Sequence, residues 1–249
     1  MLLTLKLILV PCLLYALAQS GKWWGQHVAG RLTALPWVAG PILAILALEQ
    51  GKHFAAQAAS MSVAAVAASE AFNLGYARNS HRGWQLATLA GISLWAATAA
   101  LLSGMGPGLG PAISVALLAS YLNSRLLPPR DKTHAVSACR QSPLGLRLLA
   151  GASLTLLTSF IAAHAGPQWG GIFAVFPILG CLLAIEIHRY QSVSAVNELM
   201  HGMSWGRPAF IAFCGIMAVC LVRTGIWQSI AIAMLGCLAI SELQRRLLR

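Results

Sequence analysis

The sequence predicts an all-α membrane protein with about nine transmembrane helices, arranged as two inverted four-helix repeats joined by a linker helix. Of its 249 residues, 58% are hydrophobic and only 9% are charged, whereas a soluble domain carries about 25% charged residues. Long apolar stretches recur along the whole chain, and basic residues gather between them. This composition excludes an ordinary soluble domain, a disordered chain and a disulfide scaffold.

Nine stretches are apolar enough to cross a bilayer, for which about 20 residues suffice, or fewer where a span is short or broken. The expected spans are 2–19, 33–48, 55–77, 84–103, 108–126, 147–164, 170–187, 205–222 and 226–243. The first stretch also fits a secretory signal peptide, with Lys6, an apolar run and small residues at Ala16 and Ala18. We favour a retained helix, because this stretch has a partner in the internal repeat described below.

The basic residues are distributed unevenly between the two sides of the expected membrane. With nine spans, fourteen of the seventeen Lys and Arg, Arg207 among them, fall on one side. Since Lys and Arg accumulate in cytoplasmic loops, the N-terminus is expected outside and the C-terminus in the cytoplasm. The net charge of +11 therefore indicates topology rather than nucleic-acid binding. The basic stretch 127–146 is expected to be a cytoplasmic linker, with binding of anionic lipid headgroups as the less favoured alternative.

The two halves of the chain share a pattern of helix breakers. Gly25, Gly30 and Pro36 recur as Gly166, Gly171 and Pro177, at a constant offset of 141 residues. We therefore divide the chain into a first repeat (1–104), a linker helix with a basic loop (105–146) and a second repeat (147–249). Each repeat covers four spans, and the unpaired span 108–126 would turn the second repeat over. Inverted repeats of this kind are a common plan of secondary transporters.

The second span of each repeat is expected to be broken. Pro36, Gly40 and Pro41 interrupt the first, and Pro177 and Gly180 interrupt the second. Proline removes a backbone donor and clashes with the preceding turn, and the freed polar groups cannot face lipid. Matching breaks in two halves point to a transporter's binding site, and helix N-termini favour anions. The alternative is a pair of proline kinks in ordinary packed helices.

The segments around these breaks also carry a resemblance. The run Leu35-Pro-Trp-Val-Ala-Gly-Pro41 followed by Leu48-Glu-Gln-Gly51, and the run Phe176-Pro-Ile-Leu-Gly180 followed by His188-Arg189, fit a pattern of this kind. In these runs the chain resembles a family of uncharacterised small bacterial polytopic inner-membrane proteins of about 250 residues. The likeness covers most of the chain and implies a multi-pass protein of the bacterial inner membrane, without implying an activity or site residues.

Glu70 lies inside the third expected span, with Asn73 one turn later on the same helix face. A carboxylate at membrane depth is costly and marks a functional site by default. We therefore predict that Glu70 couples transport to protons and that Asn73 belongs to the substrate site. The alternative, equally weighted, is that Glu70 reaches Arg78 or Arg82 at the inner surface.

Two further polar clusters follow the broken helices. Glu49 and His53 stand after the first, and Glu186, His188 and Arg189 stand at the end of the second. Related positions at opposite membrane sides suggest gates, although solvated helix ends are the alternative we favour. The polar run 190–204 is expected to form an interfacial or re-entrant helix, because it is too polar to span.

The segment Gly202-Met-Ser-Trp-Gly206 matches the G-x-S-x-G motif of serine hydrolases. That motif requires a strand-to-helix elbow and a histidine base, for which His188 and His201 are the candidates. No strand is expected before Ser204, so small residues for close helix packing explain the motif better.

These observations favour a gradient-driven secondary transporter or exporter of a small solute, which the helix N-termini allow to be an anion. A non-catalytic accessory or scaffold membrane protein is the alternative, and an intramembrane serine hydrolase ranks last. We expect no cofactor and no metal site. The expected partners are membrane lipids and a small-molecule solute, without nucleic acid, and a homodimer stays open.

Overall fold

The computed structural model describes residues 19–20, 23–36, 39–106, 108–129, 160, 164 and 166–247, and every element it describes is helical. The first half contains α2 (Gln26–Thr33), α3 (Ala39–Glu49), α4 (Lys52–Ala64), α5 (Val66–Asn79), the short 3-10 helix Ser80–Arg82, and α6 (Trp84–Ser103). The rest contains α7 (Leu109–Leu126), α9 (Gly166–Ala174), α10 (Ile178–Tyr190), α11 (Val193–Arg223) and α12 (Ile226–Leu247). The expected spans 2–19 and 147–164 lie outside the described residues, except for isolated positions.

Four described stretches are long and apolar enough to cross a membrane: Trp84–Ser103, Gly166–Tyr190, Val193–Arg223 and Ile226–Arg246. Ala39–Glu49 is apolar but shorter. Large apolar side chains are exposed along the outer helices, for example Leu101 on α6 and Leu235 on α12. Such surfaces suit lipid rather than water. The chain is therefore an all-helical protein with several apolar helices that can span a membrane.

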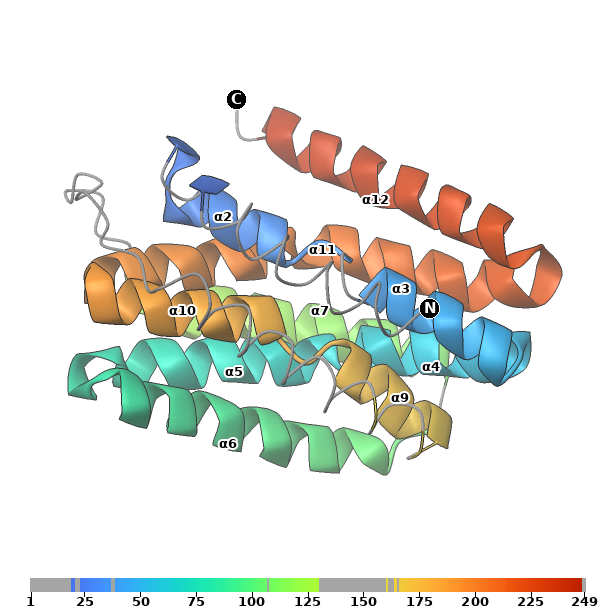
Figure 1. Ribbon diagram of the computed structural model, residues 1–249, viewed down its shortest axis with the longest axis horizontal. Coiled ribbons are helices and arrows are strands. Elements are labelled where there is room, and N and C mark those ends of the chain that lie inside the picture. Colours follow the sequence, from blue (N-terminus) through green and yellow to red (C-terminus); the bar gives the residue numbers. More distant parts are fainter. Residues whose placement is uncertain are drawn as a thin grey trace.

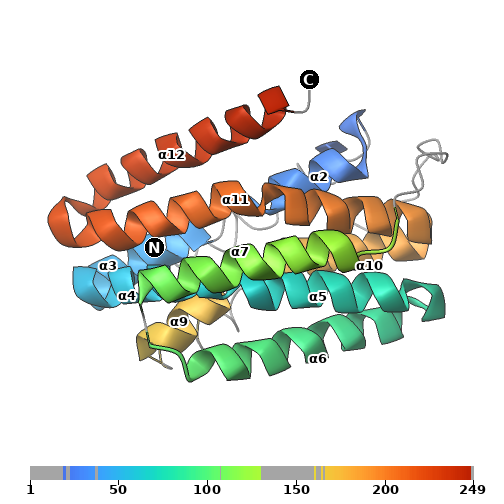
Figure 2. The same cartoon turned by 180° about the vertical axis from the view of Figure 1, so that it is seen from behind.

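The centre of the bundle is formed by α4 and α5 on one side and by α11 on the other. Figure 1 shows α4 and α5 running in the direction opposite to α11, with α6 along the outer side of α5 and α12 along the outer side of α11. From behind, α7 lies between these central helices (Figure 2), and it contacts α4, α5 and α11. The outermost position of α6 and α12 explains why so much of their surface is apolar and exposed.

Glycines allow two close helix crossings. A Cβ atom on Gly30 of α2 would overlap the carbonyl oxygen of Leu199 in α11, and one on Gly171 of α9 would overlap the carbonyl oxygen of Ala58 in α4. Small residues that let backbones approach in this way are typical of membrane helix interfaces. These crossings place α2 against α11 and α9 against α4.

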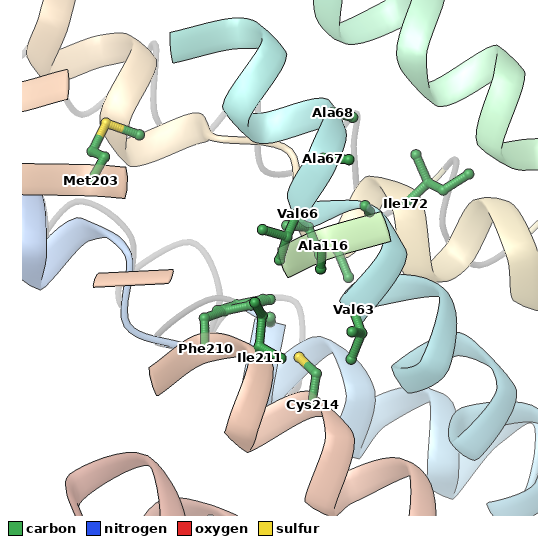
Figure 3. Close-up of a cluster of buried hydrophobic side chains, with 14 of the residues drawn as sticks. Val63, Val66, Ala67, Ala68, Ala116, Ile172, Met203, Phe210, Ile211 and Cys214 are labelled. Carbon is green, nitrogen blue, oxygen red and sulfur yellow. The ribbon is translucent and has the colours of Figure 1, made fainter. Parts of the chain in front are cut away.

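The apolar core lies where α4, α5, α7, α9 and α11 meet. Figure 3 shows side chains of α11 facing those of the α4–α5 region, with Ala116 of α7 between them. Fully buried members include Val63, Ala116, Ile172 and Cys214. Small side chains such as Ala116 allow the helices to pack closely, while larger ones fill the remaining gaps.

The structure corrects two of the expected spans. The polar run 190–204 is not a separate interfacial or re-entrant helix, because it continues into one 31-residue helix, Val193–Arg223. The Ser192 hydroxyl caps that helix by accepting a hydrogen bond from the Ala195 amide at 3.1 Å. The span 55–77 is divided by a turn at Ala65, although bonds from Ala65 N to Met61 O and from Ser69 N to Ala65 O preserve the helical pattern around it.

Candidate functional site

Both proline segments interrupt helices. In the first, α2 ends at Thr33 and α3 begins at Ala39, while the Gly40 amide donates to the Pro36 carbonyl at 2.9 Å. Pro41 lies in the first turn of α3, where its missing N–H leaves no intrahelical acceptor without a donor. In the second, α9 ends at Ala174 and Pro177 caps α10. Each interruption thus ends one helix and starts the next.

The two interruptions line one small cavity of about 40 Å³. Its described lining comes from the first interruption, the second interruption and α11: Thr33, Ala34, Leu35, Ala39, residues 174–180, Met203, Arg207 and Phe210. Pro177 and Gly180, predicted as substrate-binding residues, belong to this lining. Pro36, Gly40 and Pro41 lie next to it in the chain but are not among the described lining residues. The structure therefore brings the two breaks together, with the second contributing more of the surface.

A buried ion pair adjoins this cavity. Glu70 of α5 and Arg207 of α11 are only 2% and 4% exposed, and Arg207 Nε lies 3.4 Å from Glu70 Oε1. Because Arg207 also lines the cavity, its guanidinium connects the carboxylate to that space. A charge at this depth is costly unless it is paired, and each of these two residues compensates the other.

Three polar side chains complete the surroundings of Glu70. The Ser204 hydroxyl donates to Glu70 Oε2 at 2.6 Å, and the side-chain amides of Asn73 and Asn123 donate to the same oxygen. The two amides also donate to Ser204 Oγ, at 3.3 and 2.8 Å. Helices α5, α7 and α11 thus contribute to one polar cluster, and Asn73 belongs to it rather than to the cavity wall.

Several atoms of this cluster make no hydrogen bond within the described part of the chain. They are Glu70 Oε1, Asn73 Oδ1, Asn123 Oδ1, and Nε and Nη2 of Arg207. Buried polar groups usually have a protein or water partner. In addition, Pro208 carries no N–H, so the Ser204 carbonyl lacks its usual helical donor. Spare donors and acceptors at one place are what a proton, water or a small polar solute would satisfy.

The placement of Arg207 corrects the sequence analysis, which counted this residue with the cytoplasmic loops. It lies inside α11, buried, one turn after Ser204. Glu70 consequently does not pair with Arg78 or Arg82. Arg78 instead donates to the Leu126 carbonyl. A Ser-x-x-Arg spacing at the start of an apolar run was the sequence signal that both side chains share one helix face.

The predicted gating residues lie away from the cavity, at opposite ends of the bundle (Figure 1). Glu49 and His53 are exposed where α3 meets α4. Glu186 and His188 are half-buried, and Arg189 is exposed, in the last turn of α10. His188 Nδ1 lies 3.3 Å from the Tyr76 hydroxyl, and the Arg189 guanidinium lies over the Trp84 ring. These contacts attach the end of α10 to α5 and α6.

Ser204 has no histidine partner in the described structure. Its hydroxyl donates to Glu70, whereas His188 contacts Tyr76 and His201 Nε2 lies 2.8 Å from the Pro128 carbonyl. Ser204 also lies inside a continuous helix rather than at a strand-to-helix elbow. The geometry a serine hydrolase needs is therefore not assembled around this motif.

Comparison of the chain with protein-family models, with curated proteins and with solved structures finds no match. The function must therefore be inferred from the site itself. Its distinguishing feature is a buried acid–base pair beside a cavity between two interrupted helices.

Proposed function

We propose that this chain is a gradient-driven secondary transporter or exporter of a small solute. The solute would bind in the cavity between the two helix interruptions, and Glu70 would exchange protons. The observation that carries this proposal is the Glu70–Arg207 pair, whose arginine lines the cavity. Charged groups inside membrane helices mark solute and proton pathways, and interrupted helices mark transporter binding sites.

Inverted repeats form part of the proposal, and the helix crossings support them. Gly30 packs against Leu199, and Gly171 packs against Ala58. Both members of the first pair map onto the second through the same offset of 141 residues, with the two halves exchanged. Gly25 and Gly166, also 141 residues apart, have nearly equal positive φ angles of 85° and 84°. The opposite directions of α4–α5 and α11 agree with an inversion (Figure 1).

Such a plan supplies two conformations for alternating access. In the conformation described here, ionised Glu70 attracts Arg207 and thereby joins α5 to α11. Protonation of Glu70 would remove this attraction, because a neutral carboxyl has no Coulomb interaction of comparable strength with the guanidinium. The relative stability of two conformations would then depend on protonation, which is the requirement for coupling solute movement to a proton gradient.

The cellular setting is also proposed. We infer a multi-pass protein of the bacterial inner membrane, with about nine spans, the N-terminus outside and the C-terminus in the cytoplasm. The uneven distribution of basic residues supports this orientation. Transfer of Arg207 from a loop to a buried position in α11 changes the count by one residue and leaves the bias.

Proteoliposomes test the function. The full-length protein, Glu70→Gln and the exposed control Glu49→Gln are reconstituted with a pH-sensitive dye inside, and sodium chloride, nitrate or acetate is added outside. We expect salt-dependent proton movement with the full-length protein and with Glu49→Gln, and none with Glu70→Gln. Equal proton movement with Glu70→Gln would remove Glu70 from the mechanism.

A non-catalytic accessory or scaffold protein is the second candidate, and the small size of the cavity favours it. A scaffold predicts no proton movement with any salt. It also predicts that Glu70→Gln changes only the stability of the protein, so unfolding measurements on the same preparations separate the two candidates.

A further inference from the structure

Arg207 provides the only charge on the described cavity wall. The other lining residues are apolar side chains, glycine, proline and one threonine. Arg207 is 4% exposed, and its Nη2 makes no hydrogen bond in the described part of the chain. A buried guanidinium with a spare donor at a cavity is a site for an acceptor that carries negative charge.

Two helix N-termini meet the same cavity. Ala39 begins α3 and Ile178 begins α10, and both residues line the space. The first amides of a helix have no intrahelical acceptor, and the helix dipole places partial positive charge there. The two helices have 11 and 13 residues, long enough for this effect. The positive charge of Arg207 is thus reinforced by backbone groups from both halves of the chain.

The size of the cavity limits what it can hold. About 40 Å³ corresponds to roughly three water molecules, since one water needs about 10–15 Å³ by this measure. A halide, nitrite or nitrate fits such a volume, whereas a sugar acid or a phosphate ester does not. A single guanidinium, already shared with Glu70, matches one negative charge.

We infer that the cavity binds a small monovalent anion, with Arg207 as the residue that determines specificity for anions. This assigns a chemical class to the solute and rests on the proposed function for its physiological use, although binding itself requires no transport. Glu70 competes with the anion for Arg207, because both are acceptors of the same guanidinium. Removal of the Glu70 charge should therefore strengthen anion binding.

Anion binding is measured on the purified full-length protein by broadening of the chloride NMR signal, with displacement by sodium nitrate and with sodium gluconate as a bulky control. Glu70→Gln should lower the apparent Kd for chloride about tenfold, equivalent to about 1.4 kcal/mol. The double variant Glu70→Gln/Arg207→Gln, which leaves no unpaired buried charge, should raise the Kd at least about tenfold. Arg31→Gln is the matched control, because this arginine of α2 does not line the cavity.

Three results would overturn the inference: no broadening that nitrate displaces, a double variant that binds like the full-length protein, or weaker binding by Glu70→Gln. The proteoliposome assay separates this outcome from failure of the proposed function. Anion binding lost in the double variant without any proton movement would support the site and reject transport. Proton movement that requires Glu70 without anion binding would support transport of another solute and reject the anion site.

Discussion

Replacement of Arg207 by methionine should destabilise the protein severely, because it leaves the Glu70 carboxylate buried without its counter-charge. At 3.4 Å, two unit charges attract by about 5 kcal/mol at an effective dielectric constant of about 20. The remaining donors of Ser204, Asn73 and Asn123 offset part of the loss. We therefore expect Arg207→Met to reduce the free energy of unfolding by about 3–5 kcal/mol.

The double-mutant cycle gives the decisive comparison. Glu70→Gln/Arg207→Met removes both charges, so it should be more stable than Arg207→Met alone, with a coupling energy of at least about 2 kcal/mol. Unfolding is followed in detergent micelles by titration with SDS. The matched control is the exposed pair Glu242–Arg245, at a similar distance of 3.7 Å, for which coupling should stay below about 1 kcal/mol. Equal coupling in both cycles, or additive effects at Glu70 and Arg207, would refute the reasoning.

Three further predictions address packing, the polar cluster and topology. Gly171→Val should cost about 3 kcal/mol or more of unfolding free energy, since its side chain would overlap Ala58; Gly215→Val, at a glycine with open space, is the control in the same SDS titration. Ser204→Ala should cost about 1.5–3 kcal/mol, because it removes a hydrogen bond to buried Glu70; a loss below about 0.5 kcal/mol would contradict the cluster. Reporter fusions should place the N-terminus outside and the C-terminus in the cytoplasm, and a periplasmic C-terminal reporter would reject the proposed orientation.

Helix breakers and isolated polar residues were readable from the sequence because their physical consequences are local. Pro36 and Pro177 interrupt helices wherever the chain goes, and a glutamate at depth needs a polar partner. The identity of that partner was not readable. Arg207 stands between Trp205 and Pro208, residues typical of a span end, and its burial depends on how α11 packs against α5. The role of Asn123 likewise depends on the position of α7.

The cluster is asymmetric even though the two halves of the chain share a pattern. Glu70 and Arg207 come from different halves and do not occupy matching positions, because Ala212 stands in the place that corresponds to Glu70. The chain therefore has one ion pair across its centre rather than two related pairs. Any movement of α5 relative to α11 must lengthen the contact between Nε and Oε1 and weaken the attraction. In the proposed mechanism, the charge of Glu70 accordingly stabilises one conformation, and an anion that takes its place beside Arg207 allows the other.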